Sequence, residues 1–534
     1  MSPGTDPLTW ITRLHGHQAW ILVYALVAIP LLIGLIRGRA PAAKLAFFPV
    51  LALPITALAL LFVSMLRSSL VSWAPMLLTV RQFELAAFVV LLLFGYLGGL
   101  AAARNKNDIT HKRGTRIEDG TRLQQRRGRR SRGRRRAGQG AHALTLAGIP
   151  IPPLDETKHF KMVGTTGTGK STAIRELLEG AFARGDRAVI ADPDGGYLNR
   201  FYDASRGDVI LNPFDPRAHT WNIYGELTAA HDVEQLARSL IPDQEGSDRS
   251  WRGYARTFFT AVARQTNDAG IRDLSELYRL LSSASTDELR ILTQGTPAQP
   301  FLEGGNERMF GSIRSVTGAS LTALDYLATQ TGLPVSVRDW VRTGSGVLFL
   351  PYQADQIAAL RSIISAWLRL AIFQTMTGGE GDQRLWFIVD ELDALGPIDG
   401  LKDALARLRK FGGRCVLGFQ SIAQVSSTYG HGEAQTIVEN CGNSLILRCS
   451  ASENGGTARF ASKLIGEREV IRPTVSRTRK GGFFAEPGHS ISRGEQHVTE
   501  CAVLPAEVEQ LPDLAGYLKF ASHPAWLRIR LDLN

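Results

Sequence analysis

The stretch GTTGTGKST, residues 164–172, decides the fold of this chain. The short apolar run Phe160–Val163 precedes it and fits a strand, and the residues AIRELLEGAFARG that follow repeat apolar side chains at helical spacing. A strand, a glycine-rich loop ending in Gly-Lys-Ser and a helix, in this order, are the context that a phosphate-binding loop requires. The sequence therefore predicts an α/β fold that holds a nucleoside triphosphate.

Each residue type in this loop has a chemical reason to be there. Glycines let successive backbone N–H groups turn inward onto phosphate, Lys170 would reach the β- and γ-phosphate oxygens, and the Ser171 hydroxyl would ligate Mg²⁺. The helix that follows adds a favourable dipole at its amino end. The expected nucleotide-binding residues are Gly164, Thr165, Thr166, Gly167, Thr168, Gly169, Lys170, Ser171 and Thr172.

A second candidate motif is LWFIVDE, residues 385–391, which has five mostly apolar residues ending in two acids. This pattern fits a buried parallel strand with acids at its carboxyl end. Paired with the loop, it predicts that Asp390 holds Mg²⁺ through water and that Glu391 polarises the attacking water. The alternative interpretation is that both acids only cap the turn that follows.

The next apolar strand, residues 414–420, ends in Gln420. A glutamine at this position can sense the γ-phosphate or orient water, or it can simply hydrogen-bond the neighbouring loop. Between the two strands we expect a helix over about 399–411 that carries Arg407 and Arg409. Either arginine could reach the nucleotide of a neighbouring subunit as an arginine finger.

The loop and Asp390 are 220 residues apart, far more than one βαβ unit needs. The intervening segments 232–240, 249–264 and 273–281 repeat apolar residues at helical spacing. We therefore expect an all-α domain over 218–340, inserted into an α/β domain made of 141–217 and 341–534. Within it, Trp251, Tyr254 and Phe258 form an aromatic stripe that is more typical of core packing than of base stacking.

Three apolar runs, residues 20–36, 45–66 and 85–103, stand near the amino end. Each is close to the length of about 20 residues that spans a bilayer. They predict a transmembrane region over 1–103. Three spans with an outside amino terminus satisfy the positive-inside rule, because Lys and Arg gather after the first and third runs. Two spans are the alternative, since the first run is short and contains Pro30.

The net charge of +11 is concentrated in one segment. Residues 104–136 hold fourteen Lys and Arg against three Asp and Glu, and include RRGRRSRGRRR at 126–136. The net positive charge therefore does not indicate that the rest of the chain binds nucleic acid. The composition predicts a flexible linker over 104–140. We expect this linker to contact anionic lipid, and contact with nucleic-acid phosphates is the alternative. The four cysteines show no metal-ligand spacing.

Taken together, these motifs resemble the type IV secretion coupling proteins of bacterial conjugation, the TrwB/TraD group. The resemblance covers nearly the whole chain. It rests on the membrane runs with their basic linker and on four motifs: GTTGTGKST at 164–172, ILNPFDPRAHTWN at 210–222, FIVDELDALG at 387–396 and FGGRCVLGFQSIAQ at 411–424.

The resemblance implies a RecA-like P-loop ATPase core with an inserted all-α domain, assembled as a homo-hexamer at the bacterial inner membrane with its ATPase in the cytoplasm. It implies ATP and Mg²⁺ as cofactors, catalytic roles for Lys170, Glu391 and Gln420, and a finger role for Arg409. The partners implied are DNA, preferably single-stranded, a relaxase and the secretion channel. Some relatives carry an acidic tail where this chain ends in WLRIRLDLN, so we expect relaxase docking elsewhere, on the all-α domain. The alternative is an ATPase adaptor that recruits protein effectors.

Overall fold

The computed structural model describes residues 16–37, 40, 42–73, 80–103, 110–121, 144–242, 249–381, 383–452, 455–480 and 488–532. It divides into two compact units, which are described separately. The smaller unit is Met1–Lys112 with Val470–Val498, and the larger is Arg113–Glu469 with Thr499–Asn534. The arginine-rich stretch 126–136 lies outside the described residues.

The larger unit is built on a ten-stranded sheet. From one edge to the other its strands are β2 (Ile117–Asp119), β17 (Trp526–Arg530), β16 (Ala515–Lys519), β13 (Asn443–Ile446), β5 (Phe160–Val163), β12 (Gly413–Phe419), β11 (Leu385–Val389), β6 (Arg187–Pro193), β10 (Val347–Tyr352) and β7 (Val209–Ile210). The strands from β13 to β7 run parallel, while β16 pairs antiparallel with both β13 and β17. The carboxyl ends of the parallel strands therefore share one edge.

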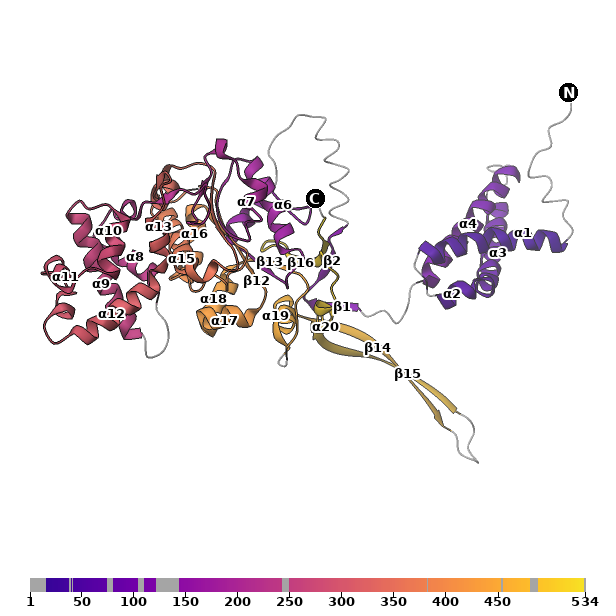
Figure 1. Ribbon diagram of the computed structural model, residues 1–534. Coiled ribbons are helices and arrows are strands. Elements are labelled where there is room, and N and C mark those ends of the chain that lie inside the picture. Colours follow the sequence, from indigo (N-terminus) through magenta and orange to yellow (C-terminus); the bar gives the residue numbers. More distant parts are fainter. Residues whose placement is uncertain are drawn as a thin grey trace, which may run out of the picture. The chain divides into compact units, whose positions relative to one another are not determined.

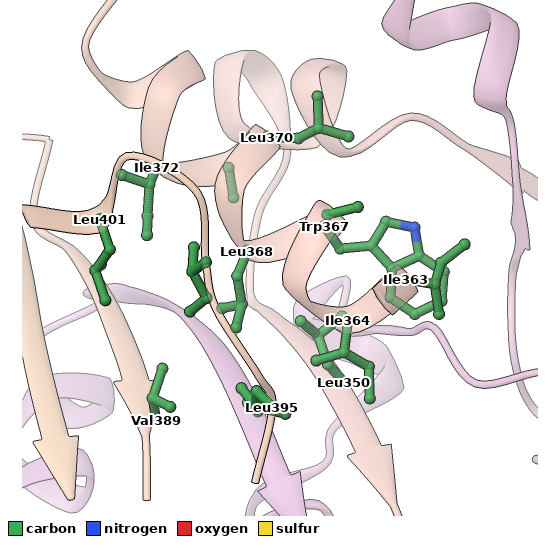
Figure 2. Close-up of a cluster of buried hydrophobic side chains, with 14 of the residues drawn as sticks. Leu350, Ile363, Ile364, Trp367, Leu368, Leu370, Ile372, Val389, Leu395 and Leu401 are labelled. Atoms are coloured by element: carbon green, nitrogen blue, oxygen red, sulfur yellow. The ribbon is translucent and has the colours of Figure 1, made fainter. Parts of the chain in front are cut away.

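The central strands are apolar along their whole length because both faces of the sheet are covered. In β11, for example, Trp386 and Ile388 join the core on one face, whereas Phe387 and Val389 join the core on the other. Helix α6 (Lys170–Ala183) packs on the first face, and α15 (Ile357–Thr375) on the second. Figure 2 shows Leu350 and Val389 from the strands together with Ile364 and Leu368 of α15.

Helix α15 is apolar almost all round because it is a core helix. Trp367 is fully buried and meets Trp221 edge-on, with 5.8 Å between the ring centroids. Among the described residues, α15 is the one helix both long and apolar enough to cross a membrane, but 61% of its apolar stretch is buried inside the protein. Its burial accounts for its composition without a membrane.

Between β8 (Thr220–Trp221) and β9 (Pro334–Val335) the described residues form helices and no strand. The helices are α8 (Asp232–Leu240), α9 (Arg249–Asp268), α10 (Leu274–Ser282), α11 (Thr286–Leu292), α12 (Glu307–Ser320) and α13 (Thr322–Ala328). Helices α9 to α12 gather together in Figure 1. Strands β8 and β9 pair in parallel, so the chain enters and leaves this helical segment at adjacent points.

The helical segment shares one continuous hydrophobic core with the α15 face of the sheet. Of the aromatic stripe predicted on α9, Phe258 is fully buried in that core, as the core interpretation requires. Tyr254 is 38% exposed and meets Trp251 and Phe301 edge-on.

The remaining short elements of the larger unit connect the sheet strands. The helices are α7 (Leu198–Phe201), α14 (Val337–Thr343), α16 (Leu401–Leu408), α17 (Ile422–Tyr429), α18 (His431–Asn440), α19 (Gly456–Ile465) and α20 (Pro505–Glu509). The 3₁₀ turns are η2 (Pro153–Lys158), η3 (Ala204–Arg206), η4 (Ile223–Glu226), η5 (Gln299–Leu302) and η6 (Arg409–Phe411). Strands β3 (Thr145–Leu146) and β4 (Ile149–Pro150) form a small antiparallel pair.

The amino-terminal residues of the smaller unit form helices. These are α1 (Gly16–Arg37), α2 (Ala42–Ala46), α3 (Phe48–Trp73) and α4 (Val80–Ala103). Helices α1 and α4 pack backbone to backbone, because a Cβ on Gly99 would lie 2.3 Å from the Leu31 carbonyl oxygen. A further sheet pairs β1 (Thr110–Gly114) with β14 (Glu467–Lys480), which in turn pairs with β15 (Gly488–Cys501).

Candidate nucleotide-binding site

The glycine-rich loop leaves the carboxyl end of β5 and leads directly into α6, as predicted. Gly167 has φ of 77° and Gly169 φ of 115°, values that side-chain-bearing residues rarely adopt. Gly164 is needed for space: a Cβ there would lie 2.8 Å from the Thr168 hydroxyl and 2.9 Å from the Leu447 Cβ. These three positions explain why the loop requires glycine.

Lys170 is the first residue of α6, and its side chain folds back over the loop. Its ammonium donates to the Gly164 carbonyl at 2.6 Å. Burial lowers the pKa of Lys170, and the negative charges of Asp390 and Glu391 oppose that effect. The amine therefore lies within the loop, facing the acids at the end of β11.

Asp390 follows β11 and receives two hydrogen bonds on the same oxygen. The Ser171 hydroxyl and the Tyr197 hydroxyl each donate to Oδ2 at 2.7 Å. The other carboxylate oxygen, Oδ1, is buried and has no hydrogen-bond partner among the described residues. A buried carboxylate oxygen without a partner, beside a serine hydroxyl, fits the hard oxygen ligands that Mg²⁺ prefers.

The described residues contain no group of three His, Cys, Asp or Glu side chains that could hold a metal ion. A cation on Asp390 and Ser171 would therefore take its remaining ligands from water and phosphate, which is the usual arrangement for Mg²⁺. The donor set fits magnesium bound together with a nucleotide.

A chain of hydrogen bonds joins Glu391 to the loop. The Gln420 amide donates through Nε2 to the Glu391 carboxylate at 2.8 Å and accepts from the Thr166 hydroxyl at 2.9 Å. Burial raises the pKa of Glu391, and the nearby charges of Asp390 and Asp393 add to this, while the bond from Gln420 lowers it. Gln420 thus contacts both the acid and the loop.

The sheet order explains why residues so far apart in sequence meet. Strand β12 lies between β5 and β11, so the loop, Gln420 and the two acids all follow the carboxyl ends of neighbouring strands. The approach is close: a Cβ on Gly418 would lie 2.3 Å from the Asp390 carbonyl oxygen. The ends of β11 and β12 therefore depend on that glycine.

Tyr197 is a residue of this site that the sequence reasoning missed. It lies in the turn after β6. The carboxylate of Asp192, near the end of that strand, accepts from the backbone N–H groups of Tyr197 and Leu198. Burial raises the pKa of Asp192 to about 6, and the charge of Asp390 contributes. The sequence signals the turn, because a strand that ends in Asp-Pro-Asp-Gly-Gly predicts one, but it does not place Tyr197 beside Asp390.

The structure does not bring Arg409 to this site. Helix α16 ends at Leu408, and Arg409 begins the 3₁₀ turn η6 just before the amino end of β12. Since β12 and β5 are parallel, Arg409 lies at the sheet edge opposite the loop of its own chain. Arg407 and Arg409 are both exposed. Arg409 borders a cavity of about 360 Å³, together with Lys158, His159 and Glu439.

With the site described, the chain can be compared with known proteins. Residues 143–532 match the family model described as the type IV secretion-system coupling protein DNA-binding domain. Coupling protein TraD of Escherichia coli K12 is 33% identical over 384 residues, covering 70% of this chain and 52% of TraD. The coupling protein VirD4 of Bartonella henselae is 24% identical over 262 residues, covering 45% and 38%. The chain spans about half the length of TraD and a smaller share of VirD4.

Solved structures of the conjugative coupling protein TrwB are also similar. The unbound form of TrwBdeltaN70 superposes with a TM-score of 0.68 at 32% identity, covering 80% of this chain and 94% of that one. TrwB in complex with ADP and Mg²⁺ gives a TM-score of 0.67 at 32% identity, covering 79% and 94%. The shared fold is mixed α/β with a large sheet.

Proposed function

Since the chain belongs to the type IV secretion-system coupling proteins, we propose that it hydrolyses ATP with Mg²⁺ and uses the energy to move DNA, with its attached relaxase, to a type IV secretion channel during conjugation. One observation carries the enzymatic part. The hydroxyls of Ser171 and Tyr197 converge on Asp390, which leaves one buried carboxylate oxygen unpartnered beside the phosphate-binding loop. The solved complex of TrwB with ADP and Mg²⁺ supports the same pair of cofactors.

The roles follow from position and chemistry. The loop residues 164–172 bind the phosphates, Lys170 balances their charge, and Ser171 and Asp390 hold Mg²⁺. The metal supplies charge neutralisation for the transferred phosphoryl group. Glu391 accepts a hydrogen bond from the attacking water, and Gln420 orients that water while contacting the loop through Thr166.

Arg409 acts in a neighbouring copy of the chain. It is exposed at the sheet edge opposite its own loop, so it can reach only a nucleotide bound by another subunit. A ring of identical subunits supplies that neighbour at every position, and we propose a homo-hexamer. The arginine then stabilises charge that develops on the phosphates in the transition state.

The amino-terminal helices anchor the protein in the bacterial inner membrane, with the ATPase in the cytoplasm. Helices α1, α3 and α4 have 22, 26 and 24 residues. At about 1.5 Å per residue each helix is longer than a hydrocarbon core of about 30 Å, although the apolar stretches described within them are shorter, at Val23–Arg37, Phe48–Ala59 and Phe88–Ala102. Small residues between α1 and α4 permit the close contact that is common in membrane bundles. Large apolar side chains such as Ile29 and Leu97 remain exposed, as lipid-facing residues would.

The α/β part is a RecA-like domain over 141–217 and 341–534, and the segment 218–340 is an inserted all-α domain. Strand β2 (Ile117–Asp119) extends the same sheet by pairing with β17, so this part of 104–140 is not the flexible linker that the sequence predicted. We propose that the all-α domain receives the relaxase. Its placement supports this role, because its chain enters and leaves through the β8–β9 pair and its helices gather away from the phosphate-binding loop.

An ATPase assay with and without DNA tests the function. A fragment that begins near residue 141 should hydrolyse ATP, and single-stranded DNA should raise the rate at low salt, where phosphate contacts are strongest. The change Lys170→Ala should abolish the activity in both conditions. A rate unaffected by DNA, with rings confirmed, would contradict the DNA pump.

That result would favour the second candidate, an adaptor that recruits protein effectors. One observation speaks for it: residues 137–534 hold 41 Lys and Arg against 45 Asp and Glu, so the body has no excess positive charge. Binding of effector proteins that stimulates hydrolysis in place of DNA would identify this function.

A further inference from the structure

His159 occupies an unusual position at the amino end of β5. Its φ is 53° and its ψ is 158°, a positive-φ conformation outside the left-handed helical region, and its side chain is 1% exposed. The backbone on its carboxyl side is also held, because the Asn443 side-chain amide and backbone N–H both donate to the His159 carbonyl, at 3.0 and 3.1 Å. The residue is therefore fixed in a strained conformation that few side chains adopt.

Both ring nitrogens of His159 contact backbone on either side of Arg409. Nε2–H donates to the Leu405 carbonyl at 2.9 Å, and Nδ1 accepts from the Cys415 backbone N–H at 3.1 Å. These partners assign the neutral tautomer that carries its proton on Nε2. Burial lowers the pKa of the ring to about 4, so the ring stays neutral in the physiological range.

The two contacts bracket the segment that carries Arg409. Leu405 lies in the last turns of α16, and Cys415 in the first residues of β12. No ion pair or side-chain hydrogen bond to another described residue holds the Arg409 guanidinium, which stands at the border of an open cavity. The location of that guanidinium therefore depends on its own backbone. The pairing of β12 with β5 holds the chain after Arg409, and the bond from the imidazole to Leu405 ties the helix before Arg409 to β5.

We propose that His159 is a positioning residue for Arg409: it fixes the end of α16 so that the guanidinium meets the nucleotide of the neighbouring subunit. This rests on the proposed function of Arg409. The bond to Leu405 is the decisive one, because Leu405 is four residues before Arg409 and therefore one helical turn away.

Two substitutions separate this role from simple stability. In His159→Gln the side-chain amide can replace Nε2 and restore the bond to Leu405. In His159→Asn the shorter side chain can replace only Nδ1 and restores the bond from Cys415. At φ 53° and ψ 158° the backbone of residue 159 lies outside the left-handed helical region that Asn favours, so neither substitute gains a backbone advantage. A purely structural role therefore predicts similar losses of stability and of kcat in the two variants, whereas positioning predicts that only the Asn variant loses kcat.

The full-length protein, purified as rings, is assayed for ATP hydrolysis. We expect His159→Asn to lower kcat by roughly tenfold to a hundredfold, because a displacement of about 1 Å can cost about a hundredfold. KM for ATP should stay within about twofold, and His159→Gln should keep kcat within about threefold of wild type. Asn440→Ala is the control. It borders the same cavity but bonds the Lys402 carbonyl in the first turn of α16, so kcat should not change.

A double-mutant cycle with Arg409→Ala decides the mechanism. If His159 acts through Arg409, the Asn change should cost nothing further in an Arg409→Ala background. Losses that multiply would overturn the positioning role and leave the finger role intact. Wild-type turnover in Arg409→Ala would overturn both. If His159→Asn does not assemble into rings, the test rests on His159→Gln. Assembled rings of His159→Gln whose kcat is lowered more than tenfold would overturn the proposal.

Discussion

At the scale of single residues, the hydrogen bonds of the site converge on Asp390. Ser171 reaches it from the helix that follows the loop, and Tyr197 reaches it from the turn after β6. Both bonds use the same carboxylate oxygen and leave the other one buried without a hydrogen-bond partner among the described residues. The carboxylate is therefore oriented before any ligand arrives, which reduces the reorganisation that binding requires.

Removing the Tyr197 hydroxyl tests this orientation. Tyr197→Phe should lower the free energy of unfolding by about 1.5–3 kcal/mol, the usual contribution of a hydrogen bond to a charged group. Denaturant unfolding of the ligand-free protein measures it. Tyr254→Phe is the matched control, because that ring is 38% exposed and should lose almost nothing. Equal losses from the two changes would contradict the role of the Asp390 contact.

The acid limb of the pH profile should report Glu391. Burial and the charges of Asp390 and Asp393 raise the pKa of this carboxyl, so on acidification it becomes protonated at a higher pH than an ordinary glutamate. Hydrolysis needs the carboxylate and should fall as pH drops through the raised pKa. The profile of kcat/KM, which reflects the free enzyme, measures it.

Gln420→Ala sharpens that test. The bond from Gln420 lowers the pKa of Glu391, so its removal should move the acid limb to still higher pH in addition to slowing turnover. An acid limb that does not move would mean that another group controls the profile.

At the scale of elements, the contact between the ends of β11 and β12 limits what residue 418 can be. Gly418→Ala would place a Cβ 2.3 Å from the Asp390 carbonyl oxygen. This oxygen belongs to the backbone, so it cannot move away without moving the strand. We expect the substitution to lower the melting temperature and to abolish most ATP hydrolysis, because Asp390 and Glu391 must shift.

Gly253→Ala is the matched control, because it adds the same methyl group at a position with free space around it. No atom lies within 4 Å of the Cβ it would add to α9. It should raise the free energy of unfolding by about 0.5–1 kcal/mol through helix propensity, with turnover unchanged. Stabilisation by the change at 418 would show that the two strand ends are less closely packed than described.

The elements that carry the site were predictable, while some of their neighbours were not. The apolar runs before Gly164, Asp390 and Gln420 are strands as predicted, because continuous burial on both faces leaves a clear pattern. Helix α15 was not predicted, because a helix that is apolar on all sides shows no helical periodicity of apolar and polar residues. Tyr197 was missed because its contact with Asp390 spans 193 residues and depends on the order of the strands, which no local pattern specifies.

At the scale of the whole molecule, mixed rings test whether Arg409 acts between subunits. Arg409→Ala should bind ATP and form rings yet hydrolyse poorly, because loss of a finger costs roughly 10³–10⁵ in turnover where one operates. Mixing it with Lys170→Ala protein should restore activity, since an intact Lys170 site then faces a neighbour that still carries Arg409. ATPase rates across mixing ratios measure the rescue.

Arg407→Ala is the control for this experiment. It removes the same charge from an exposed residue of α16, two positions earlier and about 200° around the helix. Full activity is expected. Equal loss from both changes would indicate damage to α16, and mixed rings without rescue would place the action of Arg409 within its own subunit.

The order of the strands in the sheet affects how the chain can fold while the ribosome is synthesising it. Strand β5 pairs with β12 and β13. Val416, the partner of Phe160 in β12, is synthesised about 250 residues after it. At about 5–20 residues per second this interval lasts roughly 12–50 s. During this interval the strand Phe-Lys-Met-Val, which is apolar except for its lysine, has neither neighbour. Nascent chains of this protein should therefore depend on chaperones that cover exposed strands until the far half of the sheet arrives.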